Sequence, residues 1–247
     1  MTRTQVLSYG GGRQTVAMVA LVVSGVLPRP ERIVIADTGR EKTSTWDYLS
    51  TVIQPLLAQH GMCVEIAPRS LSYTDLYAKN GDLLIPAYTR TGKLSAFCSS
   101  EWKQRVVTRY LRGLGVQQFD SWIGFALDER KRVKSTAGRV FPLLDLSLTK
   151  RDCIDIVGRA GLPLPVTSAC YMCPNLHNEE WQQVRDNYPV DFEAACLLDE
   201  NIREQDLFNG GTGLWLHHSR VPLRDANLST VDRKETSSQC GLGMCFV

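Results

Sequence analysis

Three consecutive glycines between two apolar segments constrain the fold of this chain more than any other feature. Residues 6–9 have the apolar character of a buried β-strand, residues 10–12 form a glycine turn, and residues 14–24 are an apolar run typical of a helix. A strand, a glycine turn and a helix in this order are typical of an α/β domain. Such a turn exposes backbone N–H groups at a helix N-terminus, where anions bind favourably. The sequence therefore predicts a phosphate-binding loop.

The spacing of the glycines separates classes of nucleotide-binding loop. An ATPase P-loop ends in Gly-Lys-Ser or Gly-Lys-Thr, which is missing here. The dinucleotide motif G-x-G-x-x-G is matched at Gly10 and Gly12 but not at Thr15, although Asp37 stands where a ribose-binding acid is expected. A nicotinamide dehydrogenase and a tight turn without a ligand therefore remain as alternatives.

Strand-like and helix-like segments alternate through the first part of the chain. Strands are expected at residues 33–36 and 63–66, with a long amphipathic helix at 43–60 between them. A further helix is expected at 101–111 and a further strand at 121–125. Strands and helices that alternate at these lengths predict a parallel sheet with helices on both faces.

The alternation weakens after about residue 142. One more helix is expected at 149–160, capped by Ser147 or Thr149, and it is followed by prolines, a cysteine-rich turn and a helix around Trp181. We therefore expect an α/β nucleotide-binding domain at residues 1–145. A smaller helical or irregular module that carries the metal-type cysteines is expected at residues 146–247, packed on the first.

Composition and charge exclude several classes of protein. Hydrophobic residues make up 43% and charged residues 22%, so a disordered or fibrous chain is excluded. No signal-peptide pattern is visible and no apolar run is long enough to span a bilayer, which predicts a cytoplasmic protein without a membrane partner. The net charge of +2 does not by itself indicate nucleic-acid binding. Residues 101–134 are modestly basic, which suits either phosphate binding or a solvated helix face.

The glycine loop resembles the PP-loop of the adenine nucleotide α-hydrolase superfamily. That loop usually reads Ser-Gly-Gly-x-Asp-Ser, and a three-glycine variant occurs in the branch similar to phosphoadenylyl-sulfate (PAPS) reductase. Here Gln14 stands in place of the common Asp, and Thr15 stands in place of the Ser. The resemblance implies that the nucleotide phosphates are bound by Ser8, Gly10, Gly11, Gly12, Arg13, Gln14 and Thr15.

Three further motifs resemble that superfamily in the same order along the chain. Residues 36–42, Ala-Asp-Thr-Gly-Arg-Glu-Lys, resemble its second-strand motif, residues 98–103 its Cys-Thr-x-x-x-Lys segment, and residues 123–132 its Gly-Ile-x-x-x-Glu-x-x-Arg segment. The resemblance implies that the nucleoside lies near Asp37, Thr38 and Gly124. It also implies that charge developing at the α-phosphorus is offset by Lys103, Arg130 and Arg132.

The resemblance implies a Rossmann-like fold of the HUP type and an ATP pyrophosphatase. Such an enzyme would bind ATP with Mg²⁺, release pyrophosphate and adenylate an acceptor, with sulfur transfer as the expected second step. Candidate acceptors are a base in tRNA or DNA, the DNA backbone and a small metabolite, and a sulfur donor protein is a further candidate partner. A non-catalytic nucleotide sensor is the alternative from another class of protein.

The cysteines indicate a metal site. Cys170 and Cys173 are separated by two residues, a spacing that allows two thiolates to bind one metal ion or cluster. Cys98 and Cys245 complete the expected set of four ligands, and Cys240 is the reserve fourth ligand. Four thiolates suit structural zinc or an iron–sulfur cluster. The resemblance to cluster-containing reductases and sulfur-transferring enzymes favours a 4Fe-4S cluster over zinc.

The C-terminal cysteine motif supports an alternative activity. Residues 239–243, Gln-Cys-Gly-Leu-Gly, resemble the Glu-Cys-Gly-Leu-His signature of sulfonucleotide reductases, whose cysteine attacks sulfur. The flanking Glu and His of that signature are replaced here. A PAPS or adenylyl-sulfate reductase with Cys240 as the catalytic thiol is therefore the alternative enzyme.

The other cysteines and a histidine pair are expected to have structural roles. Cys63, Cys153 and Cys196 lie in apolar or helical contexts, which predicts buried small hydrophobic residues. His217 and His218 are expected on opposite faces of a strand, with packing or surface roles.

Overall fold

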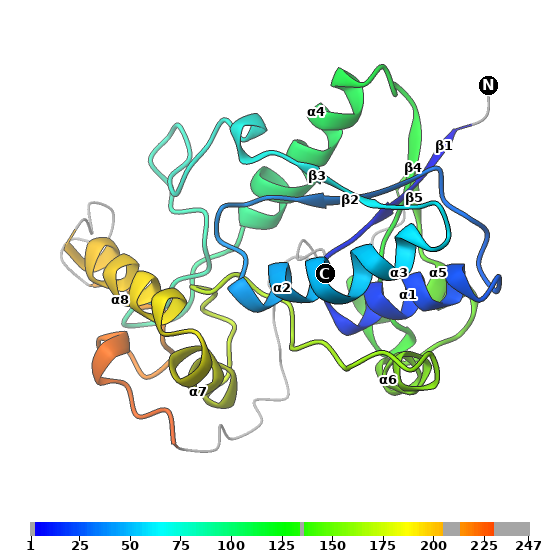
Figure 1. Cartoon of the computed structure of the whole chain (residues 1–247). Coiled ribbons are helices and arrows are strands. Elements are labelled where there is room, and N and C mark those ends of the chain that lie inside the picture. The colour runs from blue at the N-terminus through cyan, green and yellow to red at the C-terminus, as the bar shows by residue number, and fades with distance from the viewer. Residues whose placement is uncertain (1–2, 134–135, 205–212, 230–247) are drawn as a thin grey trace.

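A five-stranded parallel sheet forms the centre of the computed structural model, which describes residues 3–133, 136–204 and 213–229. Every neighbouring pair of strands is parallel, and the order across the sheet is β3-β2-β1-β4-β5 (Figure 1). The predicted α/β, Rossmann-like fold is thereby confirmed. The strands are β1 (Thr4–Ser8), β2 (Arg32–Ala36), β3 (Val64–Ala67), β4 (Phe119–Trp122) and β5 (Arg139–Val140).

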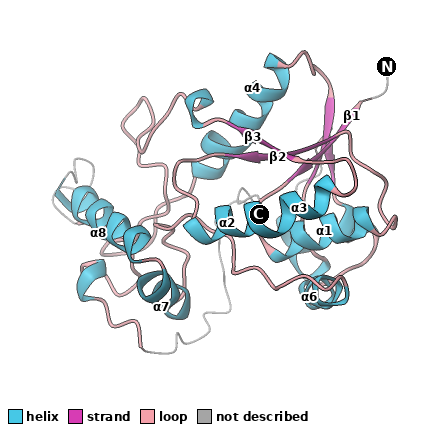
Figure 2. Cartoon of the chain, viewed as in Figure 1, coloured by secondary structure: helices cyan, strands magenta, loops and turns pink. Residues whose placement is uncertain are grey.

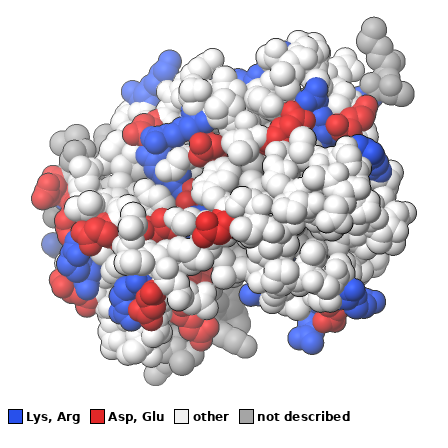
Figure 3. Space-filling model, viewed as in Figure 1, with Lys and Arg blue, Asp and Glu red and all other residues white. Residues whose placement is uncertain are grey.

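Helices cover both faces of this sheet (Figure 2). One face packs against α1 (Arg13–Val23) and α6 (Lys150–Arg159), which contact each other, and against the short helix α5 (Pro142–Asp145). The other face carries α4 (Arg105–Gly113), which contacts β2 and β3. In the view of Figure 3, the surface over α1 is largely uncharged, whereas acidic and basic side chains lie over α6.

Successive strand residues divide between the two faces. Leu7, Ile33 and Ile35 lie in the core with α1 and α6, whereas Val6 and Val34 lie in the smaller core beneath α4. All five side chains are buried. Burial of such a side chain contributes about 1.5–3 kcal/mol to folding, and burial on both faces explains the nearly continuous apolar character of β1 and β2.

The long helix expected at residues 43–60 is present but changes its geometry midway. Its parts are α2 (Thr43–Tyr48), a π-helical turn at Leu49–Ile53 and α3 (Gln54–Ala58). Pro55 has no N–H to donate to the Thr51 carbonyl, so an α-helical ladder cannot continue through this point. A second π-helical turn, Ser99–Gln104, leads into α4.

A second apolar cluster lies beside the sheet domain. It combines α7 (Asn178–Asn187) and α8 (Pro189–Glu204) with residues from the segments 76–98 and 213–228, around the buried rings of Trp102 and Trp181. By contrast, α6 packs on α1, and its residues Cys153 and Val157 belong to the core of the sheet domain. The boundary expected near residue 145 therefore does not coincide with the division between the two clusters.

The cap of α6 and the burial of two cysteines agree with the sequence analysis, whereas the exposure of Cys63 does not. Thr149 caps α6, because its hydroxyl accepts the Asp152 N–H at 3.2 Å. Cys153 and Cys196 are buried as expected, but the prediction for Cys63 is wrong, since it follows the turn before β3 and is exposed.

The expected strand at the histidine pair is absent from the described part of the chain. The segment makes an isolated bridge through Trp215 and then turns, which brings the rings of His217 and His218 to 4.2 Å between centroids. The two rings are therefore neighbours, and the prediction that they lie on opposite faces of a strand is wrong.

Asp199 on α8 holds the segment that completes the second cluster. Its side chain is 1% exposed and accepts the backbone N–H groups of Leu216 at 2.7 Å and Leu223 at 2.9 Å. Arg203, one turn further along α8, forms an ion pair with the same carboxylate. The carboxylate therefore satisfies two buried backbone donors that have no partner within a sheet or helix.

None of the helices formed by the described residues has the length and apolarity that a bilayer crossing requires.

We expect Asp199→Ala to lower the free energy of unfolding by at least about 2 kcal/mol, because it leaves two buried N–H groups without an acceptor. Asp155→Ala on α6 is the matched control, since the Asp155 side chain is 46% exposed and its one ion pair within the described ranges is with Arg151 at 3.4 Å. A loss below about 1 kcal/mol is expected there. Urea denaturation monitored by circular dichroism measures both, and equal losses would contradict the role assigned to Asp199.

Candidate functional site

The direction in which successive strands are added to the sheet reverses between β1 and β4. The chain builds β2 and β3 on one side of β1 and then places β4 and β5 on the other side. In open parallel sheets, ligands bind outside the carboxyl ends of the strands at such a switch point. The glycine loop follows β1 and residues 123–126 follow β4, so both segments lie at this position.

The glycine loop leaves backbone donors available at the start of α1. Gly12 is the N-cap residue, and no side chain of the described residues caps the first turn. Thr15 is fully buried, and its hydroxyl donates to the Gly12 carbonyl at 3.0 Å, so it closes the loop rather than facing a ligand. The first turn of α1 contains no acidic residue, and its uncapped N–H groups favour binding of an anion.

Gly11 is required by the packing of this loop. Its φ of +73° lies in the left-handed region, which favours glycine. A Cβ atom at this position would lie 2.5 Å from Cγ2 of Thr45 on α2. The loop and α2 are therefore in contact, and no larger residue fits between them.

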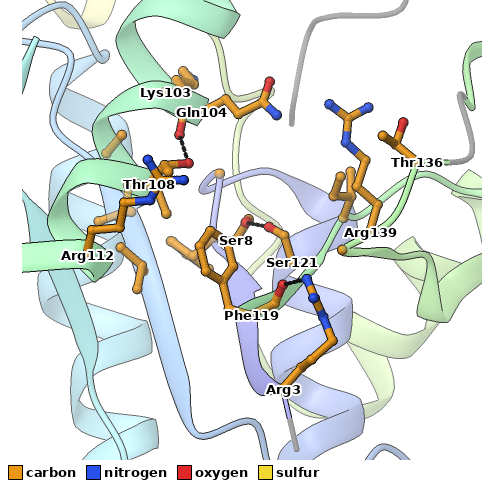
Figure 4. Close-up of a pocket in the computed structure, with 18 of the residues that line it drawn as sticks. Arg3, Ser8, Lys103, Gln104, Thr108, Arg112, Phe119, Ser121, Thr136 and Arg139 are labelled. Atoms are coloured by element: carbon orange, nitrogen blue, oxygen red, sulfur yellow. Dashed lines mark hydrogen bonds between the residues drawn. The ribbon is translucent and has the colours of Figure 1, made fainter. Parts of the chain in front are cut away.

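A cavity of about 350 Å³ opens beside the loop (Figure 4). The hydroxyls of Ser8 and Ser121 lie 2.6 Å apart in it. In Figure 4, Lys103 and Thr108 lie on one side of this serine pair and Arg139 lies on the other. Other lining residues include Tyr9, Gly10, Val34, Ala36, Glu41, Gln104, Val107, Arg112, Phe119, Ile123 and Gly138.

The lining of the cavity combines apolar and cationic groups. Apolar strand residues and serines line part of it, whereas lysine and arginine side chains outnumber the one carboxylate, that of Glu41. A planar apolar group with an anionic tail has the complementary chemistry, which is the chemistry of a nucleotide.

Lys103 and Glu41 form an ion pair at the edge of this cavity. The Lys103 Nζ lies 2.8 Å from Oε1 of Glu41, whose side chain is only 2% exposed. Burial alone lowers the pKa of Lys103, but Glu41 and the thiol of Cys170 outweigh it, so the pKa lies above its ordinary value. The ammonium group therefore stays charged. Oε2 of Glu41 is buried and has no hydrogen-bond partner among the described residues.

The thiols expected to bind a metal gather beside this ion pair. Cys170 forms an antiparallel bridge with Glu41, and the Cys173 N–H donates to the Cys170 carbonyl at 3.1 Å. Cys98 immediately precedes the π-helical turn that carries Lys103. Burial raises the pKa of Cys98 to about 11, with Cys173 adding to the shift, and it raises the pKa of Cys170, with Glu41 adding to that shift.

The chemistry of this set fits a metal group, although its present geometry does not form a metal site. Burial raises the pKa of all three thiols, and Cys173 adds to the shifts of Cys98 and Cys170, so a bound metal cation would be needed to stabilise the thiolates. Among the described residues, however, no group of three or more His, Cys, Asp or Glu side chains is arranged to hold a metal ion. The expected fourth ligand Cys245 and its reserve Cys240 lie outside the described residues.

Arg130 and Arg132 do not line the cavity. Arg130 is exposed, and Arg132 forms an ion pair with Glu129 and stacks on Phe125, 4.9 Å from the ring centroid. The catalytic role expected of these two arginines therefore stays a prediction.

Glu129 is a buried residue that the sequence reasoning did not single out, although it is the Glu of the motif at 123–132. Its carboxylate accepts the Gln14 side-chain amide at 3.0 Å and lies 3.2 Å from Nζ of Lys150. It thereby joins the start of α1 to the start of α6. This contact also explains Gln14, because the common Asp would place two carboxylates together.

The residues expected around the nucleoside support the site from outside the cavity. Asp37 accepts the Gly39 N–H at 2.7 Å, and the Thr38 hydroxyl lies 3.3 Å from Oε1 of Glu41, so both order the loop that carries Glu41. A Cβ at Gly124 would lie 3.2 Å from Cγ2 of Thr15. Gly124 therefore allows the segment after β4 to pack closely on α1.

Only some of the site residues expected from the sequence line the cavity. Arg13 begins α1, and its Nε lies 3.5 Å from the Pro165 carbonyl. Of the expected site residues, the cavity brings together Ser8, Gly10 and Lys103. Its further polar lining by Glu41, Gln104, Thr108, Arg112 and Arg139 was not predicted.

Comparisons with known proteins identify a similar fold but no family. No family model matches this sequence, and no curated protein matches it. The solved structure of the U34-tRNA thiolase NcsA from Methanococcus maripaludis with its 4Fe-4S cluster is similar over 83% of this chain and 72% of that chain. The TM-score is 0.47 and the sequence identity is 14%. The function therefore has to be inferred from the site itself.

We expect Gly11→Ala to weaken nucleotide binding and to destabilise the fold by more than Gly25→Ala. Both glycines have a positive φ, +73° and +77°, but a Cβ at Gly25 meets nothing within 4 Å. Gly25→Ala therefore reports the backbone strain alone, about 1–2 kcal/mol. Thermal melts and calorimetric titration with ATP measure both effects.

A second substitution separates the clash from the strain. Thr45→Ser removes the methyl group that the new Cβ would meet, so Gly11→Ala/Thr45→Ser should recover the stability of Gly25→Ala. If the double variant is no more stable than Gly11→Ala, the contact with Thr45 does not explain the requirement for glycine.

Proposed function

We propose that this chain binds ATP at the glycine loop and cleaves it between the α and β phosphates to adenylate an acceptor. The observation that carries the proposal is that Gly10 of the glycine loop and Lys103 line the same cavity beside β1 and β4, with the uncapped start of α1 two residues further along the chain. The loop suits the phosphates, and the apolar and serine-lined part of the cavity suits the nucleoside. Mg²⁺ would bind chiefly through the phosphate oxygens, as is usual for this ion.

Lys103 is the residue best placed to stabilise the transition state. In the proposed step, an acceptor oxygen attacks the α-phosphorus, the bond to the bridging oxygen of the β-phosphate breaks, and pyrophosphate leaves. Negative charge grows on the phosphate oxygens during this step, and a preorganised ammonium group offsets it. The ion pair with Glu41 holds Lys103 in one orientation without removing its proton.

The thiols beside Lys103 support sulfur transfer as the second step. A sulfur nucleophile would displace AMP from the adenylated acceptor, with a base in tRNA as the proposed acceptor and a sulfur donor protein as the proposed supplier. Cys98, Cys170, Cys173 and Cys245 would hold a 4Fe-4S cluster. Each iron would then carry one thiolate, so sulfur could bind to the cluster only by taking the place of one of these four ligands. Zinc in the same set would leave a structural role only.

Lys103→Met should lower pyrophosphate release from ATP by about 10²–10³-fold, because it removes an ammonium group that lines the cavity beside the loop. Lys79→Met is the matched control, since Lys79 is exposed and does not line the cavity. Pyrophosphate, AMP and orthophosphate are measured separately, with and without total tRNA. Lys103→Arg retains a charge beside Glu41 and shows whether lost activity only reflects a misfolded protein.

Two outcomes would refute the enzymatic proposal. Release of orthophosphate without pyrophosphate would indicate cleavage at a different bond. ATP that binds but stays intact with tRNA, DNA and small acceptors would favour the nucleotide sensor.

Cys170→Ser should abolish iron and sulfide binding and the broad absorption near ~400 nm of anaerobically purified protein. Cys63→Ser should retain both, because Cys63 is exposed and does not belong to the thiol cluster. Protein that holds zinc, or no metal, would contradict the cluster.

The C-terminal cysteines distinguish sulfur transfer from the reductase alternative. Cys245→Ser should resemble Cys170→Ser, whereas Cys240→Ser should keep the iron. Sulfite release from adenylyl sulfate or PAPS that is lost in Cys240→Ser would instead identify a reductase.

A further inference from the structure

One face of α4 carries a row of arginines. Arg105, Arg109 and Arg112 are spaced by four and three residues, so they project from the same side of the helix, and α4 contains no acidic residue. The buried residues Val106 and Leu111 lie on the side that faces the sheet. The arginines are therefore not required for packing of the helix on the sheet.

An exposed tyrosine lies against this row. The Arg109 guanidinium lies 3.9 Å from the ring centroid of Tyr73, and its Nη1 donates to the Leu71 carbonyl at 2.7 Å. Tyr73 is nevertheless 72% exposed. A ring that a guanidinium supports while most of its surface stays in water is a platform on which a planar group can stack.

The charge of this surface is not balanced by its acids. Arg105 pairs with Glu101, whereas Asp75 is shared between Arg69 and Arg40. The side chain of Arg112 makes no hydrogen bond or ion pair with any other part of the chain that the structure describes, and Arg112 lines the cavity. The cationic row therefore continues into the nucleotide site without a matching row of carboxylates.

We propose that Tyr73, Arg105, Arg109 and Arg112 form the docking surface for a single-stranded loop of RNA that carries the acceptor base. This inference rests on the proposed function, because it names the class of acceptor and its route to the cavity. The arginines would bind phosphates, and an unstacked base would stack on Tyr73. Sequence-specific readers of RNA mostly bind loops whose bases stack on aromatic rings or guanidinium planes.

A DNA duplex fits this surface less well. Bases in an intact duplex stay stacked on one another, so a single exposed ring beside a row of arginines would meet only the phosphates. An RNA loop uses both features of the surface, the charge and the ring.

The test measures binding of a fluorescently labelled hairpin RNA with a randomised loop by anisotropy, without nucleotide and at several salt concentrations. Arg105→Ala/Arg109→Ala should weaken binding at least 10-fold and reduce the slope of log K against log salt by about 1.4 in magnitude. Tyr73→Leu should weaken binding about 5-fold or more, whereas Tyr73→Trp should retain it. Arg151→Ala on α6 is the matched control, since its side chain is 81% exposed and lies on another helix.

The outcomes separate this inference from the proposed chemistry. ATP affinity is measured on the same variants, all of which leave the cavity-lining residues intact. Unchanged RNA binding in Arg105→Ala/Arg109→Ala, equal binding of single-stranded DNA of the same sequence, or preference for a DNA duplex would each overturn the RNA surface. Loss of RNA binding in these variants, in a protein that never cleaves ATP, would leave the surface standing and refute the adenylation instead.

Discussion

The buried ion pair between Glu41 and Lys103 is the contact on which the rest of the site depends. A carboxylate that is almost fully buried is unfavourable without a cation, and Lys103 supplies one at 2.8 Å. Glu41 belongs to the loop after β2, Lys103 to the turn before α4, and Cys170 bridges to Glu41 from the second cluster. One pair of charges thus joins the cavity, the thiols and the second apolar cluster.

Close packing defines the opposite wall of the site. Because glycine has no Cβ, the methyl group of Thr45 packs against Gly11 and the side chain of Thr15 packs against Gly124. The loops after β1 and β4 therefore lie directly against helices. The Glu129 carboxylate then ties Gln14 to Lys150 across the start of two helices. These contacts keep the backbone N–H groups of the loop in place before any ligand arrives.

Local signals in the sequence were sufficient to predict the strands, helices and glycine loop, but not the contacts between these elements. The strand at residues 32–36 and the glycine loop follow from apolar runs and turn residues, which act over a few positions. Glu41 could not be identified in that way, because its importance comes from Lys103 and Cys170, which are distant in sequence. The positions of Arg130 and Arg132 outside the cavity lining were unpredictable for the same reason, since a motif gives the order of residues but not the direction of a side chain. The assignment of Cys63 to the core shows the related weakness of reading burial from neighbours alone.

The second apolar cluster combines segments that are synthesised at well-separated times. Residues 76–98 leave the ribosome long before their partners on α7, α8 and the segment 213–228. Contacts between such distant segments form slowly, because a long loop has to close before they contribute stability. The first three strands of the sheet, and Cys98 after them, are synthesised well before Cys170 and Cys173. The set of thiols beside Lys103 is therefore complete only after all five strands of the sheet have been synthesised.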